Sequence, residues 1–114
     1  MKIIGTGSAL PKTVVTNADM EKLVETSDEW IRTRTGIQTR HIAEEDETVT
    51  YLSVEAAKRA LDMAKVAAED LDLILCASVT ADHIVPMLSC EVQAAIGAVN
   101  AVRVARFAGK PVLR

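Results

Sequence analysis

The chain has 114 residues, of which 49% are hydrophobic, and a formal net charge of −3 at neutral pH. This composition favours a packed core over disorder, and it gives no electrostatic reason to expect a nucleic-acid or membrane-surface partner. Aromatic residues make up only 3% of the chain, too few for a platform that stacks single-stranded nucleic acid. No stretch reaches the roughly 18 apolar residues that a membrane-spanning helix needs.

The chain has two cysteines, Cys76 and Cys90, too few for a disulfide framework, and this indicates a reducing, cytoplasmic setting. With His83 they could be considered as metal ligands, but zinc ligands usually come in close pairs and these residues stand singly. We therefore predict no metal site. A nucleophilic pair of Cys90 and His83 is also disfavoured, because no pattern marks a thiolate site at a helix terminus.

Short segments are expected before residue 48. Apolar runs between turn residues predict strands, and side chains that can accept hydrogen bonds from backbone amides predict helix starts. Asn17 is the expected cap of the first helix. The expected elements are a strand over 3–10, a helix over 18–25, a helix over 27–35, a strand over 37–42 and an exposed acidic loop over 44–47.

The helix expected over 27–35 has the clearest boundaries. Thr26 and Glu29 fit a capping box, in which the threonine accepts from the first turn and the glutamate bonds back. Gly36 stands where a helix commonly ends in left-handed geometry.

Trp30, the only tryptophan, and Arg34 are four residues apart and share one face of this helix. A flat ring beside a guanidinium suits a nucleotide, because the ring stacks on the base and the cation meets phosphate. From the spacing alone, a packed tryptophan beside a snorkelled arginine is the more common explanation.

The second half of the chain predicts a strand–helix–strand unit. Thr48 is expected to open a long helix whose apolar residues recur at helical spacing, and Leu73 begins an apolar run typical of a parallel strand buried on both faces. Pro86 suits the first turn of a second helix that ends at Gly97. The expected strands are 73–79 and 98–104. The fold class is therefore α/β, with a right-handed crossover and without a complete layered domain.

The pair Gly5 and Gly7 resembles the start of a phosphate-binding loop. The pattern fails, because Leu10 stands where the third glycine is needed and no long helix follows at once. We interpret these glycines as a permitted bend at a strand end.

Several motifs along the chain form one recognisable series. They are Ile4-Gly5-Thr6-Gly7-Ser8, Leu10-Pro11, Thr16-Asn17-Ala18-Asp19, Thr26-Ser27-Asp28-Glu29-Trp30-Ile31, Arg34-Thr35-Gly36-Ile37, Arg40-His41-Ile42, Asp82-His83-Ile84-Val85-Pro86 and Cys90-Glu91-Val92-Gln93. With these motifs the chain resembles the β-ketoacyl-acyl-carrier-protein synthase III family, a group of thiolase-superfamily condensing enzymes. The resemblance covers about residues 2–100, the opening third of a family member.

The resemblance implies that residues 1–114 are a partial N-terminal thiolase-like domain of an acyltransferase. Family members are cytoplasmic homodimers that load an acyl group from acyl-CoA onto a cysteine and condense it with malonyl-acyl-carrier protein, which starts type II fatty-acid synthesis. They use acyl-CoA as substrate and no permanently bound cofactor. By resemblance, Trp30 would stack on the CoA adenine, Thr26 would bond it, and Arg34 would lie toward the phosphates.

The tail, residues 101–114, departs from the family pattern. Lys110 falls where the family has its nucleophilic cysteine, and Arg103 and Arg106 fall in what should be a buried strand, where unpaired charge is costly. Lys65 stands where the family has a glycine helix cap. A frameshift or truncation would explain the tail. We therefore expect no catalytic residue in this chain and no condensing activity from it.

Two alternatives remain open on sequence grounds. One is a non-catalytic remnant that binds CoA weakly at most, and the other is a piece of a related polyketide or quinolone starter synthase. The acyl primer cannot be inferred from these residues.

Overall fold

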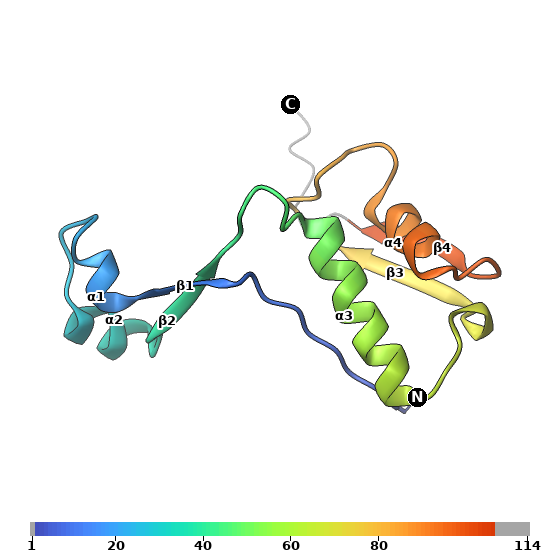
Figure 1. Cartoon of the computed structure of the whole chain (residues 1–114), viewed down its shortest axis with the longest axis horizontal. Helices are drawn as coiled ribbons and strands as arrows, with labels where there is room; N and C mark the ends of the chain where they lie inside the picture. The colour runs from blue at the N-terminus through green and yellow to red at the C-terminus, as the bar shows by residue number, and fades with distance from the viewer. Residues whose placement is uncertain (1, 107–114) are drawn as a thin grey trace. The chain divides into compact units, whose positions relative to one another are not determined.

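The computed structural model describes residues 2–106 and is of the expected α/β class (Figure 1). It divides into two compact units. One combines the start of the chain, up to Ala9, with everything from Thr48 onward, and the other spans Leu10–Glu47.

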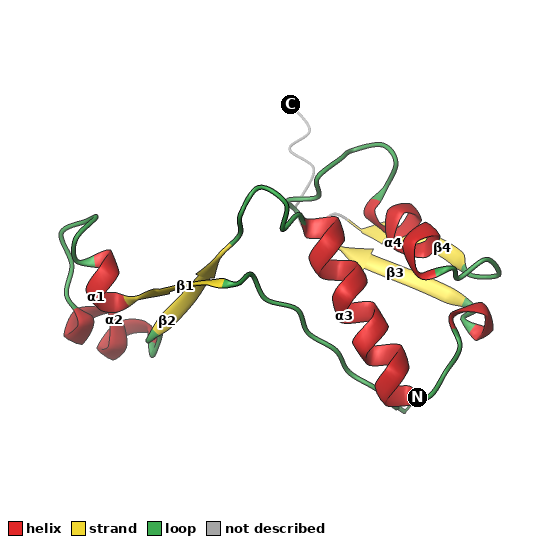
Figure 2. Ribbon diagram, viewed as in Figure 1, coloured by secondary structure: helices red, strands yellow, loops and turns green. Residues whose placement is uncertain are grey.

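The Leu10–Glu47 unit joins two short strands to two short helices (Figure 2). Strand β1 (Thr13–Thr16) pairs antiparallel with β2 (Thr39–Ile42). Between them lie α1 (Asn17–Met20) and α2 (Asp28–Thr35). The strand expected over 37–42 is therefore confirmed in its second part.

The cap of the first helix differs from the prediction. Thr16, not Asn17, caps α1: its hydroxyl accepts from the Asp19 amide at 3.2 Å, and the Asp19 carboxylate accepts from the Thr16 amide at 3.1 Å. Asn17 is the first helical residue and is only 2% exposed. The helix expected over 18–25 ends early, at Met20.

The cap of α2 lies one residue later than predicted. The Trp30 amide donates to the Ser27 hydroxyl at 3.1 Å, so Ser27 is the cap and the capping box of Thr26 with Glu29 is wrong. Adjacent serine and threonine offer equivalent acceptors, and only the backbone path decides between them. Gly36 ends the helix with φ +72°, as predicted.

The acidic loop is not fully solvated, as was expected for residues 44–47. Glu47 is 4% exposed, and its carboxylate accepts from the Lys12 amide at 3.0 Å and from the Glu44 amide at 3.2 Å. A buried carboxylate requires such partners. Glu47 therefore ties the two ends of this unit together.

The other unit contains the strand–helix–strand crossover that the sequence predicts. Strand β3 (Leu73–Ala77) pairs parallel with β4 (Val102–Arg106), and α4 (Leu88–Ile96) connects them after a loop. The long helix α3 (Val49–Ala64) packs on α4. The core consists of Val54, Leu88 and Val92, with partly buried Val49, Ala57, Cys76, Ala81 and Ile96 against it.

The strand expected over 3–10 is wrong, because residues 2–10 contain no strand in the described structure; residues 2–9 run extended beside α3 (Figure 1). Strand β3 is covered on one face: Ile74 and Cys76 are partly buried, whereas Leu73 and Leu75 are 55% and 62% exposed. The apolar run is typical of a strand buried on both faces, and the second face is open here, in agreement with the expected absence of a complete layered domain.

The helix ends follow local signals closely. Thr48 caps α3, because its hydroxyl accepts from the Tyr51 amide at 3.1 Å. Lys65 closes the same helix with φ +55°, in the conformation that glycine normally supplies. Gly97 closes α4 with φ +78°, as predicted. Pro86 lies two residues before α4 begins at Leu88, outside its first turn.

A second side chain, Asp82, accepts hydrogen bonds from backbone amides at the start of α3. The carboxylate of Asp82 accepts from the Val49 amide at 3.0 Å and from the Thr50 amide at 2.6 Å. Desolvation acts to raise the pKa of Asp82, but the hydrogen bonds from Thr50, Val49 and Thr48 outweigh it and lower the pKa.

We expect Asp82→Asn to lower the free energy of unfolding at pH 7 by about 1 kcal/mol, because a charged acceptor at the helix start is lost. The folded-state pKa of Asp82 is lowered, so its stabilisation is full above the unfolded-state pKa and disappears as pH falls through the folded-state value. Urea melts should therefore show a larger difference between Asp82→Asn and the unmodified chain at pH 7 than at pH 3. Asp62→Asn, which changes an exposed carboxylate paired with Lys65, is the control. An equal loss at both pH values would contradict this role of Asp82.

Candidate functional site

The helix α2 carries the residues that the sequence singles out. Trp30 is 57% exposed although it is the largest side chain in its unit, and the Arg34 guanidinium lies 5.7 Å from the centre of the Trp30 ring. At this distance the cation interacts with the ring face. The packed-tryptophan interpretation is therefore wrong for the described structure: the ring is available to a ligand.

A pocket of about 240 Å³ opens beside this ring. It is lined by Glu25, Thr26, Ser27 and Trp30. The structure thus brings Thr26 and Trp30 together in one wall, and the cation–π contact keeps Arg34 at the ring. Glu25 and Ser27 were missed by sequence reasoning, although their place on either side of Thr26, at the start of the predicted helix, was a usable signal.

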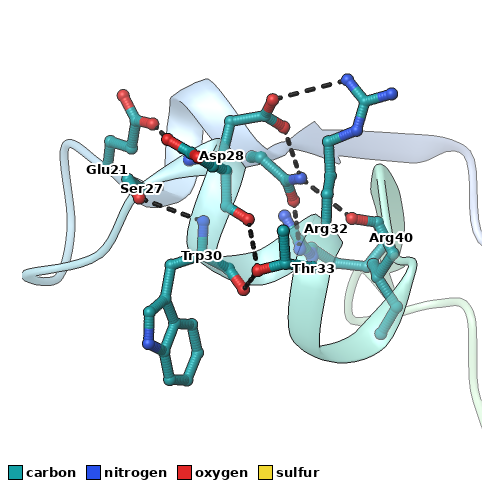
Figure 3. Close-up of polar contacts among 10 residues, drawn as sticks. Glu21, Ser27, Asp28, Trp30, Arg32, Thr33 and Arg40 are labelled. Carbon is teal, nitrogen blue, oxygen red and sulfur yellow. Dashed lines mark hydrogen bonds and ion pairs between the residues drawn. The ribbon is translucent and has the colours of Figure 1, made fainter.

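The Trp30 ring is presented by a firmly held backbone. Its amide is fixed by Ser27, and its carbonyl accepts from the Thr33 hydroxyl at 3.2 Å (Figure 3). Figure 3 shows the indole ring pointing away from the hydrogen-bonded residues at the start of the helix. The ring can therefore meet a planar partner without breaking these bonds.

A larger pocket, of about 520 Å³, lies in the other unit. Its lining includes Thr6, Gly7, Ser8 and Arg59, but the Arg59 guanidinium is engaged by the Ser8 carbonyl at 2.6 Å. Its residues do not form a catalytic constellation. The phosphate-loop pattern of Gly5 and Gly7 has no helix N-terminus following it, in agreement with the sequence.

Of the residues considered as metal ligands, His83 is engaged by another side chain. His83 pairs with Glu91 at 2.8 Å, and Glu91 also accepts from the Thr50 hydroxyl at 2.7 Å. Cys76 and Cys90 are free thiols. Among residues 2–106, no three side chains of the ligating types lie together as a metal site. Nor does any helix in that range have the length and apolarity to cross a membrane.

Comparison with known proteins finds no matching family model, but it finds similar curated proteins and solved structures. A curated relative, "Beta-ketoacyl-[acyl-carrier-protein] synthase III 1" of Bacillus cereus, is 54% identical over 99 residues, which are 87% of this chain and 32% of the relative. The crystal structure of 3-oxoacyl-[acyl-carrier-protein] synthase III from Aquifex aeolicus VF5 superposes with a TM-score of 0.89 at 51% identity, over 94% of this chain and 34% of that one.

Over most of its own length the chain is similar to β-ketoacyl-acyl-carrier-protein synthase III proteins. It spans about a third of the length of the relatives that it matches. The priming β-ketosynthase from the R1128 polyketide biosynthetic pathway also superposes with a TM-score of 0.89, at 36% identity over 94% of this chain and 32% of that one. The described α/β units are therefore part of a thiolase-like fold, as the sequence resemblance implied.

The divergent tail is only partly described. Arg103, which the family pattern places in a buried strand, is exposed on β4. Lys110, which falls at the position of the family's nucleophile, lies outside the described residues.

Proposed function

We propose that this chain is part of an acyltransferase that condenses acyl-CoA with malonyl-acyl-carrier protein, and that α2 contributes to binding the CoA nucleotide. The identity with curated synthase III proteins supports the reaction class. The observation that carries the nucleotide site is the exposed Trp30 ring, with Arg34 at 5.7 Å and a pocket at its side.

Each proposed binding residue has a chemical role that fits CoA. The Trp30 ring offers a face to the adenine, and stacking of this kind does not depend on the base. The Thr26 hydroxyl can bond the base edge from the same pocket wall. Arg34 supplies a planar, permanent cation for phosphate. In this proposal acyl-CoA is a substrate, and no cofactor stays bound.

The remaining parts of the proposal concern the larger protein. In it, the acyl group would pass from CoA to a cysteine and then to the carbanion formed when malonyl-acyl-carrier protein loses carbon dioxide. This step would start type II fatty-acid synthesis in the cytoplasm. The working form would be a homodimer.

A starter synthase for polyketides is the second candidate, and the 36% identity with the R1128 priming β-ketosynthase favours it. The two candidates share CoA binding and differ in the acyl primer and the carrier protein. Product analysis with acetyl-CoA and with longer acyl-CoA substrates would separate them in a protein that carries the complete fold.

Trp30→Ala should weaken CoA binding by about 1–3 kcal/mol, the usual scale of base–aromatic stacking. This corresponds to a dissociation constant about 5- to 150-fold higher in isothermal titration calorimetry. Arg34→Lys should weaken CoA binding less, because the charge remains and the planar fork is lost.

The matched control is Tyr51→Ala, which removes a 46% exposed aromatic side chain from α3 instead of α2. It should leave CoA affinity unchanged. If Trp30→Ala binds CoA as tightly as the unmodified chain, α2 is only structural and the nucleotide site is wrong. If the unmodified chain itself binds no CoA, the nucleotide site is wrong and the remnant interpretation is favoured.

A further inference from the structure

The side chain of Asn17 makes three hydrogen bonds from a nearly fully buried position, at 2% exposure. Its amide nitrogen donates to the Asp28 carboxylate at 2.7 Å and to the Ile37 carbonyl at 2.9 Å. Its amide oxygen accepts from Nη2 of Arg40 at 2.7 Å. Both donors and the acceptor of this amide are therefore used.

These contacts reach both ends of the helix that carries Trp30. Asp28 is the first residue of α2, and Ile37 follows directly after Gly36, its closing residue. One buried side chain thus clamps the start and the end of α2, while Arg40 connects the clamp to β2. A helix of eight residues that is held at both ends has little freedom to roll about its axis.

The start of α2 has further ties. The Asp28 amide donates to the Glu21 carboxylate at 2.6 Å, and Nη1 of Arg32 lies 3.5 Å from the other Asp28 oxygen (Figure 3). Asp28 is thus held through its backbone and through both carboxylate oxygens. Figure 3 shows this network on the opposite side of the helix from the Trp30 ring. The network can orient the ring without occupying its exposed face.

We propose that Asn17 and Arg40 are positioning residues for nucleotide binding: they clamp α2 so that Trp30 and Arg34 face the ligand. This inference rests on the proposed CoA site. Neither residue contacts the pocket beside Trp30, so any effect on affinity must pass through the orientation of α2. Preorganisation of this kind lowers the cost of binding, because the free protein already holds the bound geometry.

A substitution at Arg40 can distinguish an effect on the orientation of α2 from an effect on stability. Its Nη1 atom is buried and has no hydrogen-bond partner among the described residues. Arg40→Met therefore removes a buried, unpaired donor together with the bond to Asn17, and the two effects on stability oppose each other. The substitution also removes the link between β2 and the clamp on α2, and nothing compensates for this loss in the orientation of α2.

The test uses the fluorescence of Trp30, which is the only tryptophan in the chain and so reports on this site alone. The variants are Asn17→Asp and Arg40→Met, and the control is Thr13→Val. The control removes the 2.7 Å bond from Thr13 to Glu44 in the same unit and leaves α2 untouched. Each protein is titrated with CoA and with adenosine 3′,5′-bisphosphate, and its melting is followed by circular dichroism.

Arg40→Met should raise the dissociation constant for CoA about tenfold, the scale of one lost hydrogen bond to a charged group. The same factor is expected with adenosine 3′,5′-bisphosphate, because the effect lies at the nucleotide. Acrylamide quenching of Trp30 should also change without ligand. Melting should shift no more than in Thr13→Val, which should keep the original CoA affinity. Asn17→Asp should lose at least as much CoA affinity as Arg40→Met. If Asn17→Asp does not fold, the result for Arg40→Met alone tests the proposal.

Three results would overturn the inference. If the unmodified chain gives no response to CoA, the nucleotide site is wrong and the positioning role falls with it. If it responds and folded Arg40→Met responds equally, only the positioning role is contradicted. If Thr13→Val weakens CoA binding as much as Arg40→Met, the loss reflects general destabilisation and not the clamp on α2.

Discussion

Neither thiol of this chain is expected to accept an acyl group from acetyl-CoA. A condensing enzyme needs a thiolate, which attacks the thioester and later leaves when the carbanion arrives. Burial first, and then the neighbouring Cys90 thiol, raises the pKa of Cys76 above its ordinary value. At neutral pH Cys76 is therefore almost entirely a thiol, the unreactive form.

Among the described contacts, neither cysteine is hydrogen-bonded to a histidine. Nδ1 of His41 lies 2.6 Å from the Pro11 carbonyl, and Nδ1 of His83 lies 2.8 Å from the Glu91 carboxylate. Cys90 stands in the first turn of α4, whose start is held by the Met87 carbonyl. The described structure thus offers no Cys–His pair of the kind that activates a nucleophile.

The measurement is incubation of the 114-residue polypeptide with labelled acetyl-CoA, followed by digestion and mass spectrometry. We expect no hydroxylamine-sensitive label on Cys76 or Cys90, and no condensed product after addition of malonyl-acyl-carrier protein. Alkylation by iodoacetamide serves as the control for access, and at Cys76 it should accelerate as pH rises. A thioester on either cysteine would show that the thiols are activated after all.

Local patterns predicted three of the helix ends, because the responsible contacts lie within one turn. Thr48, Gly36 and Gly97 act where the sequence placed them. The neighbourhood of Trp30 and Arg34 followed in the same way from their spacing of four residues. The parallel pairing of β3 with β4 was also predictable, because a strand, a helix and a strand in this order have few alternative arrangements.

Features that depend on distant residues could not be predicted. Asn17 matched a helix cap locally, yet its side chain bonds Asp28, Ile37 and Arg40, which lie 11, 20 and 23 residues away. Residues 3–10 had the composition of a strand, but a strand is defined by a partner, and none pairs with them in the described structure.

Gly7 illustrates a residue whose role appears only in three dimensions. A Cβ atom at this position would collide with the Ala56 carbonyl oxygen and lie 2.6 Å from the Ala60 amide nitrogen, both in the backbone of α3. Gly5 is similar, with the Ala60 carbonyl oxygen at 2.5 Å. Positive φ among the glycines is confined to Gly36 and Gly97 in the described residues. Gly5 and Gly7 therefore provide space for close packing on α3, and not the bend that the sequence suggested.

Gly7→Ala should lower the free energy of unfolding by about 3 kcal/mol, the upper end of the cost of overpacking, because the atoms it meets belong to a helix backbone. The alternative response is a shift of residues 6–8 away from α3. This would break the bond from Arg59 to Ser8 and the contact of the Thr6 amide with the Met63 sulfur. Both responses cost stability, so relaxation cannot make the substitution neutral.

Gly97→Ala in the same unit is the matched control, because a Cβ there meets nothing within 4 Å and only the positive φ is penalised. That penalty is about 1–2 kcal/mol. Urea unfolding followed by circular dichroism should therefore rank Gly7→Ala as clearly more destabilising than Gly97→Ala. If Gly7→Ala unfolds at the same urea concentration as the unmodified chain, residues 2–9 do not pack on α3 in solution. If Gly7→Ala loses some free energy of unfolding, but less than Gly97→Ala, this would also contradict a backbone collision. Flexible surroundings would then have absorbed the added methyl group.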